Sequence, residues 1–286
     1  MKLPTTVKHL LTLRRPQANP SPSWERLHGI FTPTLAKAAQ HNARDGWLVL
    51  ATSTLLTANV PAAVSHLYRY VSRREPLSDS AESLLSAEER TAQAAIIREA
   101  ALKSVIFVGV PRVILTLEAL SGALENDVKA SLRKVPFRVV GADNAEEFTR
   151  RGQALWKHIY APHDVKLADK LAGYHPDFMS FITTSYGVVF SPWFKGDPGY
   201  GPGNLSRTLG SVVGVACLRT ESGVGPQLIS HVYGLLKSNV EYEGKEPTDG
   251  EKWLASEQGT EWVINSIDQI GDVARSGIDA ELKARL

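Results

Sequence analysis

Residues 225–237 read G-P-Q-L-I-S-H-V-Y-G-L-L-K, and this stretch decides the fold expected for the chain. Its apolar residues recur at helical spacing, so one face should pack into a core: Leu228, Ile229, Val232, Leu235 and Leu236. Gly225-Pro226 comes first, and the fixed φ of proline suits the first turn of a helix. His231 falls at the edge of the apolar face. The stretch therefore predicts a helix that holds an imidazole beside a core.

The same pattern occurs earlier in the chain. Pro61-Ala-Ala-Val-Ser-His66-Leu-Tyr68 matches Pro226-Gln-Leu-Ile-Ser-His231-Val-Tyr233, with a constant offset of 165 residues (231 − 66). An apolar helix is predicted before each copy, around 47–56 and 209–218. We therefore expect an internal duplication of a helical unit.

The composition is that of a globular protein, with 43% hydrophobic and 22% charged residues among 286. A chain of this length forms either one large domain or two fused halves. A net charge of +2, with no basic block interleaved with aromatics, argues against a nucleic-acid partner. No apolar run reaches the roughly 18 residues that a transmembrane helix needs, so no membrane partner is expected.

Cysteine and histidine usage argues against a metal or another cofactor. The single cysteine, Cys217, excludes an internal disulfide and any site built from several cysteines. The eight histidines form no His-x-x-x-His pair and no His-Glu-x-x-His motif. We expect neither a metal site nor a cofactor.

The order of the predicted elements divides the chain into five parts. We expect an extended, Pro-rich arm over 1–24, a first helical repeat over 25–124, a polar linker over 125–145, a second helical repeat over 146–280 and a tail over 281–286. No strand pattern competes over a useful length, so the predicted fold class is all-α with two tandem helical repeats. Residues 191–204 hold four glycines and three prolines; this loop is either functional, such as a lid, or a tolerated surface insertion.

The two ends of the chain indicate different compartments. Residues 1–24 contain no Asp or Glu and weakly match a mitochondrial presequence. The last three residues, Ala284, Arg285 and Leu286, resemble the Ser-Lys-Leu peroxisomal signal. We favour the peroxisome, with its import receptor as a partner, and keep the mitochondrion as the alternative.

Three segments together carry a resemblance to a known superfamily. They are Glu99…Phe107-Val-Gly109-Val-Pro111, Arg207-Thr-Leu-Gly-Ser-Val-Val-Gly-Val-Ala-Cys-Leu and Gln227-Leu-Ile-Ser-His231-Val-Tyr-Gly-Leu-Leu. In this order they resemble the alkylhydroperoxidase D-like superfamily, which includes carboxymuconolactone decarboxylases. The double-repeat form with a peroxisomal signal looks like a fungal branch. The resemblance implies a helical fold that assembles into a homodimer or a larger ring and takes a small-molecule substrate.

The departures from the superfamily pattern decide which chemistry is expected. Its peroxidases carry Cys-x-x-Cys before the histidine, where this chain has Val224 and Gln227, and Asn59 and Ala62 in the first copy. Without a thiolate pair there is no peroxidatic attack and no resolving disulfide, so a thiol peroxidase is not expected. Of the decarboxylase pattern, Arg207 and His231 remain.

Each candidate site residue has a functional and a structural interpretation. His231 is either a general acid or base or a core histidine. Arg207 either binds a substrate carboxylate bidentately or lies exposed in a first helical turn. Gln227, Tyr186 and Cys217 are further candidates for substrate binding, although Tyr186 could be a packing residue and Cys217 a buried apolar one.

Two further residues are expected to be structural. His66 lacks an arginine at the position equivalent to Arg207, where the chain has Asn42. Glu99 and Lys103 stand in the favourable i,i+4 order of a surface ion pair.

The leading functional hypothesis is a peroxisomal decarboxylase-like enzyme. It would perform acid–base chemistry (decarboxylation, isomerisation or hydrolysis) on a small carboxylate-bearing metabolite, with Arg207 holding the anion and His231 moving a proton. The alternative is a catalytically silent binding or scaffolding member. Convergence of Arg207 and His231 on one closed pocket would favour the enzyme.

Overall fold

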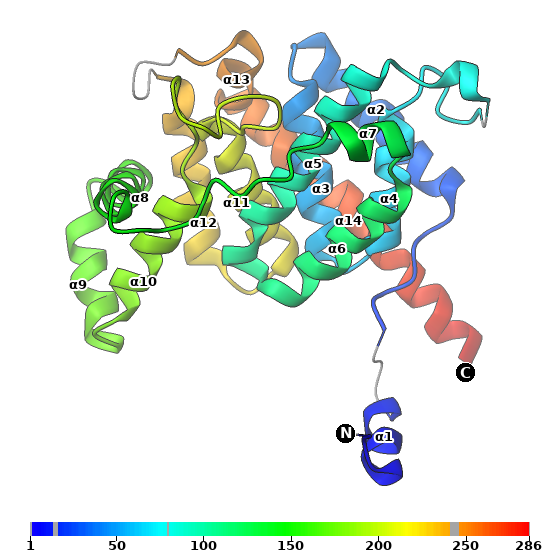
Figure 1. Cartoon of the computed structure of the whole chain (residues 1–286), viewed down its shortest axis with the longest axis horizontal. Coiled ribbons are helices and arrows are strands. Elements are labelled where there is room, and N and C mark those ends of the chain that lie inside the picture. Colours follow the sequence, from blue (N-terminus) through cyan, green and yellow to red (C-terminus); the bar gives the residue numbers. More distant parts are fainter. Residues whose placement is uncertain (1, 14–16, 79, 241–245, 286) are drawn as a thin grey trace.

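The computed structural model describes residues 2–13, 17–78, 80–240 and 246–285, with the side chains of the last helix described as far as Ser276. This part of the chain forms 14 α-helices, two 3-10 helices and one π-helix, and no strand beyond an isolated bridge between Arg73 and Leu84 (Figure 1). The predicted all-α fold class is confirmed.

The elements before the predicted linker region and within it have the following bounds: α1 (Thr5–Thr12), α2 (Trp24–Gln40), α3 (Arg44–Thr57), α4 (Pro61–Val71), η1 (Ala81–Ser83), α5 (Ala87–Val108), α6 (Val110–Ala123) and α7 (Asn126–Ser131). The elements after it are α8 (Ala145–Tyr160), α9 (Asp164–Tyr174), α10 (Phe178–Ser185), the π-helix η2 (Tyr186–Phe190), α11 (Arg207–Glu221), α12 (Gly225–Leu236), η3 (Lys237–Asn239), α13 (Asp249–Leu254) and α14 (Glu257–Arg285).

Helices α3 and α11 form the centre of the molecule. Both are buried over most of their length, in accord with sequences that are apolar or small on nearly every side. They pack on each other, and each also packs on α5 and on α14. The α4 helix lies on α3 and α6, whereas α12 lies on α11 and α8. The core is therefore two buried helices with a layer of amphipathic helices around them.

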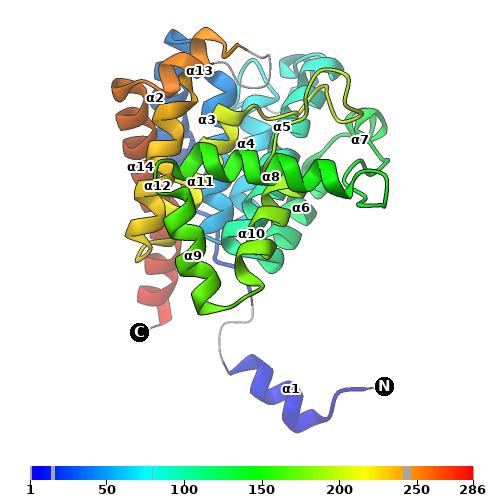
Figure 2. The ribbon, with the colours of Figure 1, turned by 90° about the vertical axis from the view of Figure 1, so that its left-hand side faces the viewer.

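The first 57 residues differ from the expectation in two places. Residues 5–12 form α1 instead of an extended arm, because Val7, Leu10 and Leu11 recur at helical spacing and the prolines flank the helix. None of its residues is buried, and α1 stands apart from the other helices (Figures 1 and 2). The periodic segment 34–57 spans parts of two helices, α2 and α3, which are separated at Asn42 with its positive φ of 56°.

The polar segment 125–145 is not a plain linker at its start. Residues 126–131 form α7, whose Val128 is buried in the main core. Arg90 of α5, itself buried, binds Asp127 with its Nη2 2.6 Å from Oδ2, and its Nη1 lies 3.0 Å from Glu125 Oε2. The charges that suggested a solvated linker thus attach the segment to α5.

The targeting tripeptide falls at the limit of the described residues. The backbone of Ala284 and Arg285 belongs to α14, but their side chains and all of Leu286 lie outside the described residues. Within the described part of the chain, no helix is long and apolar enough to cross a membrane.

Candidate functional site

His231 projects from α12 into the centre of the second half. Its side chain is 2% exposed, and it lies against α11 at Gly214. A Cβ on Gly214 would stand 2.6 Å from Nδ1 of His231, so only glycine admits the imidazole here. The small-residue face of α11 predicted a close neighbour, and that neighbour is the His231 ring of the adjacent helix.

The orientation of α12 differs slightly from the prediction. Its buried residues are His231, Gly234 and Leu235, whereas Ile229 is 59% exposed. The buried face is thus narrower than the apolar pattern and is centred closer to His231. The histidine is part of the face, not at its edge.

Two tyrosines from other elements meet His231. The hydroxyls of Tyr160 on α8 and Tyr186 on η2 each lie 3.4 Å from Nε2 of His231, and 3.2 Å from each other. The rings of Phe107 and Phe190 stand roughly edge-on to the imidazole, with centroids 5.1 and 6.3 Å away. The three polar side chains form a cluster inside an aromatic enclosure, and we refer to His231, Tyr160 and Tyr186 as the His–Tyr cluster.

Burial sets the protonation of the His–Tyr cluster. It lowers the pKa of His231 to about 4 and raises the pKa of Tyr186 and of Tyr160, the Tyr160 shift being opposed by its hydrogen bond to Tyr186. All three groups are therefore neutral near pH 7. Nδ1 of His231 has no hydrogen-bond partner among the described residues. The imidazole can thus accept or donate one proton at Nε2, depending on its tautomer.

Backbone contact between α8 and η2 brings the two tyrosines together. A Cβ on Gly152 would meet the carbonyl oxygen of Thr183 at 1.9 Å, and one on Gly187 would meet that of Phe148 at 1.8 Å. The helices can approach this closely only with glycine at both positions. The π-helix itself shows in the bond from the Ser191 N–H to the Tyr186 carbonyl at 2.7 Å, and π-helical turns are frequent at functional sites.

A buried lysine caps this π-helix. Lys103 is 0% exposed and donates to three consecutive carbonyls, those of Val189, Phe190 and Ser191, at 3.1, 2.7 and 3.0 Å. Three acceptors match the three N–H groups of an ammonium, and the carbonyl end of a helix favours a cation. Burial lowers the pKa of Lys103 to about 7, while the Glu99 carboxylate acts against this shift. Lys103 thus fixes the segment that carries Phe190 and leads into the 191–204 loop.

The predicted surface ion pair between Glu99 and Lys103 is wrong in its location. Both residues are buried, with Nζ 3.6 Å from Oε1 of Glu99. Glu99 also binds both Nη atoms of Arg138. The i,i+4 pair is present, but it belongs to a buried network of three charges.

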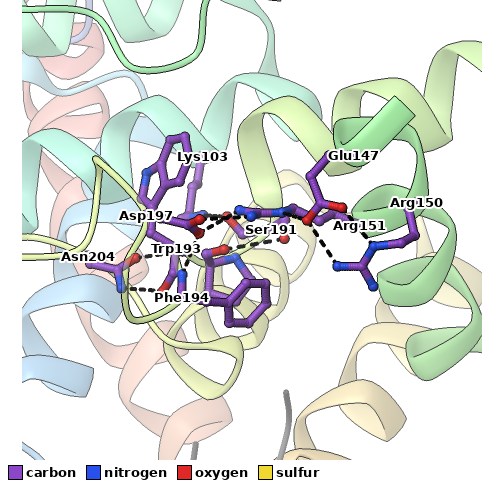
Figure 3. A network of polar contacts seen from close by, with 10 residues as sticks. Lys103, Glu147, Arg150, Arg151, Ser191, Trp193, Phe194, Asp197 and Asn204 are labelled. Atoms are coloured by element: carbon purple, nitrogen blue, oxygen red, sulfur yellow. Dashed lines mark hydrogen bonds and ion pairs between the residues drawn. The ribbon is translucent and has the colours of Figure 1, made fainter. Parts of the chain in front are cut away.

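The 191–204 loop is fastened to the protein by side chains (Figure 3). Arg151 of α8 binds Asp197 through two bonds of 2.7 and 2.9 Å, and Asp197 also accepts from the N–H of Phe194 at 2.7 Å. Asn204 bonds both the N–H and the carbonyl of Trp193, at 3.0 and 2.8 Å. These contacts give the loop a defined conformation in spite of its glycines and prolines.

Arg207 does not reach the His–Tyr cluster. It is buried and donates through Nη2 to the carbonyls of Lys237 and Val240, both at 3.1 Å, and through Nη1 to Nδ1 of His158 at 3.2 Å. It lies seven residues before Gly214 on α11, roughly 10 Å along the helix axis. Arg207 is thus neither exposed nor next to His231, and it binds the backbone that follows α12.

The other candidate residues are placed as follows. Gln227 is exposed one turn before His231, and Cys217 is fully buried in α11. Burial raises the pKa of the Cys217 thiol to about 11, against the Ser104 and Thr57 hydroxyls, so the thiol is protonated at neutral pH. His66 is half-buried, packs edge-on to Trp24 at 5.6 Å, and has its pKa lowered by burial and by the Arg69 charge.

Sequence reasoning missed Tyr160 and Lys103. Tyr160 precedes a Pro-containing turn at the end of α8, and nothing local indicates that it meets His231. Lys103 is flanked by Ala100, Ala101 and Ser104, all buried, and this small-residue context was the available signal.

Among the described residues, no group of three or more His, Cys, Asp or Glu side chains is arranged to hold a metal ion. No protein-family model, no curated protein and no solved structure matches the chain. The superfamily resemblance therefore stays a prediction.

Proposed function

We propose that the chain is a double-repeat protein of the alkylhydroperoxidase D-like type, with an acid–base site at the His–Tyr cluster of its second unit. The observation that carries the proposal is a neutral, buried imidazole whose Nε2 lies 3.4 Å from two tyrosine hydroxyls. The substrate class, a small carboxylate-bearing metabolite, rests on the resemblance alone. Peroxisomal location and homodimer formation stay predictions.

The cluster suits proton transfer for a chemical reason. With Nδ1 protonated, Nε2 of His231 accepts a proton from the Tyr186 hydroxyl while the phenolic oxygen takes one from the substrate; the reverse sequence returns it. Tyr160 bonds the same hydroxyl at 3.2 Å and would stabilise the developing phenolate. Arg207 is not part of this proposal, because its Nη donors bind two carbonyls and His158.

Substrate access requires a wall of the enclosure to move. His231 is 2% exposed, and the π-helix η2 carries two of the surrounding rings, Tyr186 and Phe190. A π-helix has less favourable geometry than an α-helix, so a shift of η2 towards α-helical bonding is the least costly opening.

Several features support the tandem-repeat part of the proposal. The α3–α4 and α11–α12 pairs both turn through residues with positive φ, Asn59 and Ser222, and each second helix begins with a proline in its first turn. The central helices of the two pairs pack on each other, and α5 and α14 each pack on both.

One observation favours the second candidate, a catalytically silent binding member. The residue that the resemblance implies for the substrate anion, Arg207, binds the protein's own backbone. If no substrate reaches the His–Tyr cluster, the histidine is a core residue that orders η2.

Deuterium incorporation separates the two candidates even while the substrate is unidentified. The protein is incubated in D2O with a panel of small carboxylic, keto and hydroxy acids, and mass spectrometry detects exchange at carbon or loss of carbon dioxide. The enzyme hypothesis predicts exchange in at least one compound that Tyr186→Phe slows by about 10²–10⁴-fold, the range for a positioned acid or base. Exchange that persists in folded Tyr186→Phe contradicts the proposed site, and no exchange in any compound favours the silent member.

A further inference from the structure

A second cavity lies on the other side of the charged network, between α5, the segment after α7 and the 191–204 loop. Its volume is about 400 Å³, within the usual range of small-molecule sites. Three aromatic side chains line it, Phe137, Trp193 and Tyr200, together with the side chains of Arg98 and Arg133. We refer to this cavity as the arginine groove.

The two arginines are held close together in the arginine groove. Both Nη atoms of Arg98 donate to the main-chain carbonyl of Arg133, at 3.3 Å each. The guanidinium of Arg133 lies over the Phe137 ring, 4.5 Å from its centroid, and donates to the Val135 carbonyl at 2.6 Å. Burial and the neighbouring Arg133 charge both lower the pKa of Arg98, against the opposite effect of Glu99, as expected for two cations at one place.

The nearest acid is committed elsewhere. Glu99, which lines the same cavity, binds Arg138 and lies 3.6 Å from the ammonium of Lys103. Among the described residues, no carboxylate lies within 4.0 Å of Arg98 or Arg133. The groove therefore carries a positive charge that the protein itself does not neutralise by an ion pair.

The walls of the groove are preformed. Trp193 is clamped by Asn204, and the Arg138 guanidinium stacks over its ring at 5.2 Å. At the other end of the loop, a Cβ on Gly203 would lie 2.7 Å from the Cβ of Ala95, so the loop is in direct contact with α5. A ligand would meet a fixed aromatic wall, which lowers the entropic cost of binding.

We propose that the arginine groove binds a small organic anion with an apolar body, the anionic group at Arg98 and Arg133 and the body against Trp193 and Tyr200. This site is separate from the His–Tyr cluster. Phe107, which touches His231, lies nine residues after Arg98 on α5, roughly 14 Å along the helix. The proposal therefore does not depend on the proposed acid–base function.

The probe for the test is anilinonaphthalene sulfonate, a fluorescent aromatic anion, with the full chain. It should bind the wild type with energy transfer from tryptophan, and octanoate should displace it much better than octanol, which has the same body without the charge. Binding should weaken as sodium chloride is raised, because it depends on two cations. Arg98→Met and Arg133→Met should each weaken it about tenfold or more, the usual effect of losing a charge-assisted bond.

Two controls make the result specific. Arg219→Met removes an arginine that is paired with Asp268 on another face, and should leave probe affinity unchanged. His231→Gln should also leave it unchanged, which separates this site from the proposed function. Binding that is insensitive to salt, equal displacement by octanol, or equal loss in Arg219→Met would each overturn the proposal. The salt and octanol results come from the wild type, so they hold even if an arginine variant fails to fold.

Discussion

Acidification should weaken the fold through His231, because the native state excludes its proton. The ordinary pKa of the group is 6.5, and burial lowers it to about 4 in the folded protein. Between these values the unfolded chain binds a proton that the native protein does not, so stability is fully present above pH 6.5 and falls as the pH decreases. Between pH 7.5 and 4.5 the expected loss from this one group is about 2.5 kcal/mol.

Urea unfolding followed by circular dichroism measures this contribution. His231→Gln removes the titrating group and keeps a side chain that can bond both tyrosines, so its unfolding free energy should fall by about 2.5 kcal/mol less than that of the wild type over the same pH range. The difference should persist in about 0.5 M salt, since burial alone causes the shift. Parallel pH profiles for wild type and variant would refute the buried, neutral state of His231.

Three further perturbations test the surroundings of the site. Gly214→Ala places a methyl group 2.6 Å from His231 Nδ1 and should lower stability by about 1–3 kcal/mol, measured by urea unfolding. Arg207→Met removes charge-assisted bonds to two carbonyls and should cost about 1.5–3 kcal/mol, while any turnover per folded molecule stays unchanged. Asp197→Asn loosens the clamp to Arg151, so hydrogen exchange should accelerate in amides 193–204 with little change in melting temperature. Unchanged stability in the first two, or unchanged exchange in the third, contradicts the role assigned to that residue.

The sequence was sufficient for the helices and for the place of His231. Helical spacing and the first-turn proline predicted α12, and the small residues of α11 predicted a close neighbour, which is the imidazole at Gly214. The rotation of α12 was not predictable, because Ile229 is as apolar as Leu235 and only tertiary packing decides which is covered. The first 24 residues show the same limit, since prolines outweighed the short leucine pattern that forms α1.

The roles of charged residues were the least predictable. An arginine in a first helical turn gives no sign that it will bind carbonyls thirty residues later, as Arg207 does at Lys237 and Val240. Glu99 and Lys103 have the spacing of an exposed pair, and only the carbonyls of η2, more than eighty residues away, explain why the lysine is buried. Such long-range polar contacts leave no periodic signal in the sequence.

Proton transfer by His231 is the step on which the proposed function depends. For any compound that exchanges deuterium, the rate with wild type is compared with that of His231→Gln at a pH where circular dichroism shows both to be folded. We predict a loss of about 10²–10⁴-fold in the variant. Exchange at the wild-type rate by folded His231→Gln would show instead that His231 is a core histidine and moves no proton.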